Sequence, residues 1–215
     1  MLYDCRSVAD RDRGIAAAIE AVKGGELVVL PTDTVYGLGA DAFTAHAVTS
    51  LLHAKGRGRD VPPPVLVGSR HTLDGLVFSL PRTARDLVEA FWPGALTIVV
   101  QHSPTLQWDL GETGGTVAVR MPLHPVAIEL LRETGPMAVS SANKHGQPPA
   151  TTAEEAREQL EYAVRVYLEA GPCPDPVPST IVDVTGDVPR VLRGGAIPLE
   201  KLQDVVPDIV AGGEG

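Results

Sequence analysis

Several features that define other classes of protein are scarce or missing in this chain of 215 residues. Its two cysteines, Cys5 and Cys173, lie far apart without a second Cys or His at ligand spacing, so neither a disulfide framework nor a zinc site is expected. Aromatic residues make up only 4%, which argues against a stacking platform for single-stranded nucleic acid. No apolar run reaches the roughly 18 residues of a membrane span, and the first residues lack the apolar segment of a signal peptide. We therefore expect no membrane contact and a location in the reducing cytoplasm.

Common catalytic signatures are also missing. The sequence contains no GxxxxGK[ST], GxSxG or HExxH motif, and its six histidines show no metal-ligand spacing. Gly37 and Gly39, followed by Ala42, superficially match a dinucleotide fingerprint. The fit is poor, because six residues separate Leu30, the last apolar residue of the preceding strand, from Gly37, whereas the fingerprint turn is tight.

The overall charge is acidic, with 18 Lys and Arg against 27 Asp and Glu and a net charge of −9. Such a balance disfavours nonspecific binding of nucleic acid over the whole surface and leaves room for a local basic site. Hydrophobic residues at 44% and charged residues at 21% are typical of a soluble globular domain.

Hydrophobic periodicity predicts helices interleaved with short apolar strands, which is typical of an α/β domain. The expected helices cover residues 9–23, 44–54, 82–91, 125–132, 153–161 and 199–205, and the expected strands cover 26–30, 65–67, 96–100, 117–120, 137–140, 165–168 and 181–184. A loop without a helix separates strands 96–100 and 117–120, so part of the sheet should be antiparallel. We expect a single domain over residues 1–210, with helices on a twisted mixed sheet, and a disordered tail over residues 211–215.

Two of these strands carry polar residues on one face. Side chains two apart share a face of a strand, so Thr116, Ala118 and Arg120 lie together, with a small residue between a hydroxyl and a guanidinium. This arrangement leaves room for a ligand, although a half-exposed strand facing water would look the same. Ser141 and Asn143 end another strand, where they suit either a polar ligand or a simple turn.

A concentration of basic residues follows the second expected helix. Lys55, Arg57 and Arg59 lie in a glycine-broken stretch with only Asp60 opposing them, and glycine lets the backbone approach a phosphate. Such cations favour an anion site, but they could equally cap the negative end of the helix. Arg193 is a further candidate for the same anion.

Taken together, these segments resemble the YrdC-like family, the L-threonylcarbamoyladenylate synthases. The matching motifs occur in one order along nearly the whole chain: LPTDTVYGLGADAF at 30–43, KGR at 55–57 followed by PPPVLV, FWPGALTIVV at 91–100, TVAVRMP at 116–122, SSAN at 140–143, PSTIVDV at 178–184 and VLRGGAI at 191–197. Several motifs of this length in the same order make chance agreement improbable.

The resemblance implies formation of threonylcarbamoyl-AMP and pyrophosphate from L-threonine, bicarbonate and ATP, with Mg²⁺ on the ATP phosphates. This product supplies the threonylcarbamoyl group for adenosine beside the tRNA anticodon, through a downstream transferase complex and with at most weak tRNA contact. By motif position, the catalytic signature is Lys55, Arg57, Ser141 and Asn143; L-threonine contacts are Thr32, Leu66, Arg120, Val139 and Ser179; ATP contacts are Arg57, Val61, Thr116, Ser141, Pro149 and Arg193.

The chain departs from the family pattern at Val61, where relatives usually carry Lys or Asn, so one polar ATP contact passes to the backbone or to Arg59. Two other interpretations stay open. One is a noncatalytic module that binds double-stranded RNA or tRNA with the same fold, and the other is a paralogue with carbamoyl-transfer chemistry on another acceptor. The proline-rich loop 171–178, which precedes Ser179, is expected to close over the site.

Overall fold

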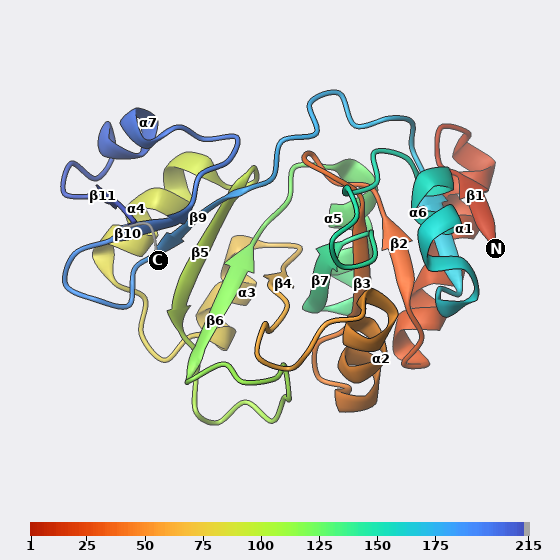
Figure 1. The fold of residues 1–215 in the computed structure, drawn as a ribbon, viewed down its shortest axis with the longest axis horizontal. Coiled ribbons are helices and arrows are strands. Elements are labelled where there is room, and N and C mark those ends of the chain that lie inside the picture. Colours follow the sequence, from red (N-terminus) through yellow and green to blue (C-terminus); the bar gives the residue numbers. More distant parts are fainter. Residues whose placement is uncertain (213–215) are drawn as a thin grey trace.

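The computed structural model describes residues 1–212, in which strands form one sheet with helices packed on both of its faces (Figure 1). The sheet follows the order β1-β8-β2-β3-β7-β4-β6-β5-β9-β10-β11. The strands are β1 (Leu2–Asp4), β2 (Val28–Leu30), β3 (Gly37–Asp41), β4 (Val65–Leu66), β5 (Leu96–Gln101), β6 (Thr116–Arg120), β7 (Met137–Ser141), β8 (Val166–Glu169), β9 (Thr180–Asp183), β10 (Arg190–Arg193) and β11 (Val210–Ala211). The helices are α1 (Val8–Lys23), α2 (Ala45–Lys55), α3 (Arg70–Leu76), α4 (Arg82–Phe91), α5 (Pro125–Thr134), α6 (Ala153–Leu160), a 3-10 turn η1 (Glu161–Ala163) and α7 (Leu199–Gln203).

The sheet mixes parallel and antiparallel pairs, as the sequence predicts. β5 runs antiparallel to β6 across the loop that lacks a helix, and it runs parallel to β9 on its other side. β4 pairs in parallel with β6 and antiparallel with β7. The predicted α/β class with a mixed sheet is therefore confirmed, and β5 is held by hydrogen bonds along both edges.

Alternation along each strand divides the apolar side chains between two cores. The larger core lies on one face under α2, α3, α4 and α6, and the smaller core lies on the other face under α1 and α5. In β2, for example, Val29 belongs to the larger core, while Val28 and Leu30 belong to the smaller one. α1 and α5 pack against each other, and the apolar residues of the smaller core come largely from these helices and from β2, β7 and β8.

The main difference from the sequence-based expectation is β3, whose residues we expected to form a loop. Glycines normally interrupt strands, but here they allow β3 to pass close to the side chains of β7. A Cβ atom on Gly37 would lie 2.6 Å from Val139 Cγ1, and one on Gly39 would lie 2.7 Å from Met137 Cε. The glycine-rich motif therefore continues the sheet, with β2 on one side and β7 on the other.

Short elements at the periphery were also not anticipated, namely β1, α3, β10 and β11. We expected Ala211 and Gly212 to belong to a disordered tail. Instead, Ala211 belongs to β11, which pairs with β10, and the Gly212 amide donates to the Val191 carbonyl. These contacts satisfy backbone groups at the end of the described chain. The remainder of that expected tail, residues 213–215, lies outside the described residues. Among the described helices, none combines the length and the apolar character needed to cross a bilayer.

Gly68, between β4 and α3, tests how tightly this fold is packed. A Cβ atom there would lie 2.8 Å from the Arg132 backbone nitrogen in α5, so Gly68→Ala should destabilise the fold by about 1–3 kcal/mol through overpacking. A Cβ atom added to Gly75 in α3 would have no neighbouring atom of the described residues within 4 Å, so Gly75→Ala should stabilise the fold by roughly 0.5–1 kcal/mol. Urea unfolding measures both variants, and equal effects at the two positions would contradict the described packing.

Candidate active site

A cavity of about 410 Å³ lies on the face of the sheet that carries the smaller core. Alternate residues of β5 and β6 contribute Thr97, Val99 and Ala118 to its lining, and their neighbours in sequence point into the larger core. Of the residues predicted from the sequence, the lining includes Thr32, Arg57, Val61, Leu66, Arg120, Val139, Ser141, Pro149, Ser179 and Arg193. Three positive side chains from distant segments therefore meet in one hollow.

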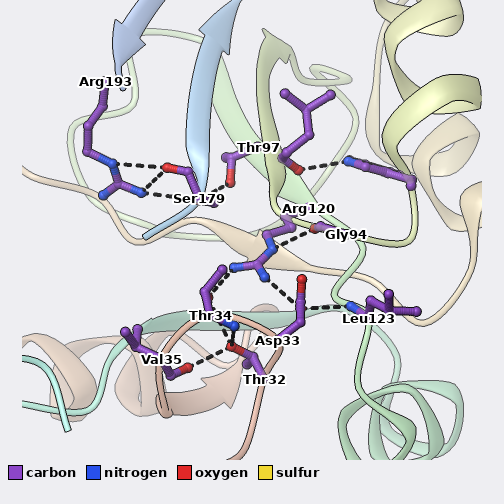
Figure 2. A network of polar contacts seen from close by, with 12 residues as sticks. Thr32, Asp33, Thr34, Val35, Gly94, Thr97, Arg120, Leu123, Ser179 and Arg193 are labelled. Carbon is purple, nitrogen blue, oxygen red and sulfur yellow. Dashed lines mark hydrogen bonds and ion pairs between the residues drawn. The ribbon is translucent and has the colours of Figure 1, made fainter. Parts of the chain in front are cut away.

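Arg120, at the end of β6, is fixed by three residues from two other segments of the chain (Figure 2). Its Nε donates to the Gly94 carbonyl at 2.9 Å, Nη1 donates to Thr34 Oγ1 at 2.9 Å, and Nη2 donates to Asp33 Oδ1 at 2.7 Å. Asp33 also accepts from the Leu123 amide at 2.8 Å, which fixes the carboxylate. The Arg120 and Asp33 side chains are 8% and 16% exposed, so the charge of Arg120 is largely neutralised. Its remaining N–H groups can still bind a ligand.

The turn that follows β2 is organised by the hydroxyl of Thr32. Thr32 Oγ1 donates to the Val35 carbonyl at 2.6 Å and lies 3.2 Å from the Thr34 amide, which donates to it. These local bonds hold Thr34 and Asp33 in contact with Arg120. Thr32 was predicted from the sequence as a site residue. Asp33 and Thr34 were not predicted, although both lie within the LPTDTVYG motif.

A second cluster of polar contacts joins β10, β9 and β5 on another side of the cavity (Figure 2). Arg193 donates from Nη2 to the Ser179 carbonyl at 2.7 Å and to Ser179 Oγ at 3.1 Å. Ser179 Oγ lies 2.8 Å from Thr97 Oγ1. Burial, together with the nearby Arg57, lowers the pKa of Arg193. Sequence reasoning missed Thr97, whose signal is a hydroxyl within the apolar run of β5.

Arg57 follows the end of α2, where Gly56 adopts a left-handed conformation with φ 66° and turns the chain toward the cavity. Its Nη1 lies 3.5 Å from Ser140 Oγ, and its buried Nε has no hydrogen-bond partner within the described part of the chain. Among residues 1–212, no carboxylate lies within ion-pair distance of Arg57 or Arg193. The cavity therefore keeps uncompensated positive charge, which favours an anionic ligand.

Lys55 does not line the cavity, contrary to the expectation that its ammonium faces the anion. The residue is 2% exposed, and Nζ donates to the Ser141 carbonyl at 2.5 Å, the Asn143 carbonyl at 2.7 Å and Asn143 Oδ1 at 3.3 Å. Asn143 itself donates from Nδ2 to the carbonyls of Lys144 and Gln147. Buried carbonyls need hydrogen-bond donors, and Lys55 and Asn143 supply them to the bend after β7. Both residues thus stabilise the conformation of this bend.

Two further predicted contacts differ from expectation. Thr116 is absent from the cavity lining, and its Oγ1 donates to the Thr113 carbonyl at 2.9 Å at the start of β6. Arg59 forms an exposed ion pair with Asp109, so it does not replace the polar group missing at Val61. Val61 lines the cavity and is 42% exposed. No group of three His, Cys, Asp or Glu suited to a metal occurs among residues 1–212.

The geometry describes an α/β domain with a cavity lined by arginines on one sheet face, and comparison with known proteins identifies the family and the fold. The family model for Sua5, YciO and YrdC, described as "Telomere recombination", matches residues 20–195, so the chain belongs to this family. A Mycobacterium tuberculosis protein named putative threonylcarbamoyl-AMP synthase is 61% identical over 204 residues, covering 95% of this chain and 94% of the relative.

A longer relative and a solved structure extend this comparison. The Bacillus subtilis threonylcarbamoyl-AMP synthase is 38% identical over 94% of this chain, which matches 59% of that protein's length. The crystal structure of Pyrococcus abyssi Sua5 complexed with L-threonine superposes with a TM-score of 0.90 at 35% identity, covering 99% of this chain and 62% of the other. The predicted family and fold are therefore confirmed.

Lys55 generates a prediction about pH. Burial, with a smaller contribution from Arg57, lowers the pKa of Lys55 from 10.5 to about 8. Between these values the unfolded chain binds more protons than the folded one, so this group's contribution to the unfolding free energy rises with pH from about 8 to 10.5. In urea unfolding, the unfolding free energy of the wild type minus that of Lys55→Met should increase over that pH range. A decrease would mean that the carbonyl contacts raise this pKa instead.

Proposed function

We propose that this chain is a threonylcarbamoyl-AMP synthase, a nucleotidyltransferase that converts L-threonine, bicarbonate and ATP into threonylcarbamoyl-AMP and pyrophosphate. The observation that carries the proposal is the charge balance of the cavity. Arg57, Arg120 and Arg193 line it, and only Arg120 has a carboxylate partner within residues 1–212. The names of the relatives support the same activity, and the P. abyssi structure supports an amino-acid substrate.

The part of the cavity around Arg120 suits the amino acid. The free N–H groups of Arg120 and the hydroxyl of Ser179 can bind the threonine carboxylate, with Thr32 beside them. Leu66 and Val139 supply apolar surface for the rest of the substrate. Because Arg120 is anchored by Asp33 before any ligand arrives, it binds without reorganising.

The nucleotide is assigned to the part with unpaired charge. Arg57 and Arg193 bind the phosphates, Ser141 and Pro149 lie along the lining, and Val61 offers apolar contact. Mg²⁺ accompanies ATP on its phosphates. Lys55 and Asn143 act indirectly, because their contacts hold the bend that presents Ser141. Thr116 is the ATP contact with least support, since its hydroxyl already binds Thr113.

The reaction brings like charges together, and the arginines offset their repulsion. The threonine amine and bicarbonate condense to an N-carboxylate with loss of water, and an oxygen of this carboxylate attacks the α-phosphorus of ATP. The bond from that phosphorus to the bridging oxygen breaks, and pyrophosphate leaves with the electron pair. Fixed cations stabilise the charge on the transferring phosphoryl oxygens. No histidine base is needed at this step, because the nucleophile is already an anion.

The wider role follows from the instability of the product. The threonylcarbamoyl group would pass to adenosine beside the tRNA anticodon through a downstream transferase complex in the cytoplasm, with at most weak tRNA contact by this chain. The hydroxyl-lined hollow favours a small molecule over duplex RNA, which needs a broad surface. Duplex RNA binding without product would support the noncatalytic module, and a carbamoyl product on another acceptor would support the paralogue.

Arg57→Ala tests the synthase assignment. Incubation with threonine, radiolabelled bicarbonate, ATP and Mg²⁺ should yield a labelled adenylate and pyrophosphate. Loss of one preorganised cation should lower the rate about 10²-fold to 10³-fold. Arg59→Ala is the matched control, because Arg59 is a nearby arginine paired with Asp109 outside the cavity lining, and its rate should stay near that of the wild type. Equal rates in both variants, or no adenylate from the wild type, would refute the assignment.

Closure of loop 171–178 can be followed by the rate at which Cys173, which lies within the loop, reacts with a thiol reagent. Cys173 is partly buried, whereas Cys5 is buried and has its pKa raised to about 11 by that burial, so Cys173 should react first with a thiol reagent. Threonine with a nonhydrolysable ATP analogue should slow the Cys173 reaction several-fold. The Cys173→Ser variant should lose this reaction, which would show that the labelling comes from Cys173 and not from Cys5. Identical labelling rates with and without ligands would exclude closure.

A further inference from the structure

Thr97 is a buried hydroxyl in the middle of the sheet that no step of the proposed reaction uses. The residue is 2% exposed and lies in β5, where its neighbours Leu96 and Ile98 point to the opposite face of the sheet, into the larger core. β5 is paired with β6 on one edge and with β9 on the other, and Thr97 is in register with Ile181. Its hydroxyl is therefore carried by a strand that is hydrogen-bonded along both edges rather than by a loop.

Thr97 forms a hydrogen bond with Ser179 in which either hydroxyl can be the donor. Among residues 1–212, the only hydrogen-bond partner of Thr97 Oγ1 is Ser179 Oγ, at 2.8 Å. If Ser179 were the donor, the hydrogen of Thr97 would have no acceptor among residues 1–212 and would be left to solvent or ligand in the cavity. If Thr97 is the donor, the hydrogen of Ser179 stays available to a ligand, and this is the arrangement that a carboxylate bound at Ser179 requires.

Ser179 accepts a second hydrogen bond from Arg193. Nη2 of Arg193 donates to Ser179 Oγ at 3.1 Å, and the same atom donates to the Ser179 carbonyl at 2.7 Å (Figure 2). A serine oxygen offers two lone pairs and one hydrogen. With both lone pairs occupied by Thr97 and Arg193, the hydrogen of Ser179 is left to point into the cavity as a donor.

We propose that Thr97 is a positioning residue for the amino-acid site, which orients Ser179 as a hydrogen-bond donor toward an anionic oxygen of the substrate. The inference rests on the proposed function, which assigns Ser179 to threonine binding. It goes beyond that function because it gives Ser179 a fixed donor role and names the residue that sets it. The matching ligand group is a carboxylate oxygen, which can only accept.

The test is a double-mutant cycle on threonine affinity, measured by calorimetry and compared with KM and kcat. Thr97→Val keeps the shape and removes the donor, so threonine should bind about tenfold more weakly, with KM rising more than kcat falls. Thr97→Ser restores the hydroxyl and should recover most of the affinity. In a Ser179→Ala background, Thr97→Val should cause no further loss, because its effect passes through Ser179.

Thr134→Val serves as the structural control, since it removes a threonine hydrogen bond in α5 outside the cavity lining and should leave threonine affinity unchanged. Unchanged affinity in Thr97→Val would overturn the inference alone. A further loss in the double variant would also overturn it, because Thr97 would then contact the substrate directly. A wild-type chain that binds no threonine would overturn the proposed function and this inference with it.

Discussion

The buried contact between Arg120 and Asp33 joins parts of the chain that are far apart in sequence. It connects the end of β6 to the turn after β2, and Asp33 extends the link to the Leu123 amide. An arginine removed from water needs partners for its charge and its N–H groups, and these partners come from two segments distant along the chain. Such a pair adds little net stability compared with an apolar core, but it fixes the orientation of a charge. The amino-acid part of the cavity depends on that orientation.

Charge is distributed unevenly within the cavity, and in the proposed reaction this asymmetry separates the site of the amino acid from that of the nucleotide. Arg120 carries its own counter-ion and presents hydrogen-bond donors with little net charge, which suits a single carboxylate. Arg57 and Arg193 lack carboxylate partners within residues 1–212, so their positive charge is available to a polyanion. Arg193 also donates hydrogen bonds to Ser179, so it connects the part of the cavity proposed for the nucleotide with the part proposed for the amino acid. The uncompensated charge is local, because the chain as a whole carries a net charge of −9.

Strand periodicity explains how much of the site could be predicted from the sequence. The shared face of Ala118 and Arg120 follows from alternation alone, and both residues line the cavity. Arg193 was a candidate from its charge and its neighbouring glycines, whereas resemblance to a family added Thr32 and Ser179, which lie where no periodicity operates. Helix α4 matches its predicted bounds because its apolar spacing is regular and Pro81 precedes it. β3 was missed because its glycines are typical of loops, and only the neighbouring side chains of β7 show why a strand needs them there.

Sequence alone determined which chemical groups this protein has and, within each strand, which of them share a face, because a period of two is a local property of the backbone. Tertiary structure decided which part of that face α1 and α5 leave open. It also directed the ammonium of Lys55 into the bend after β7, while Arg57, two residues later, lines the cavity. These choices depend on which buried carbonyls need a donor and on how helices pack, and both are set by residues distant along the chain.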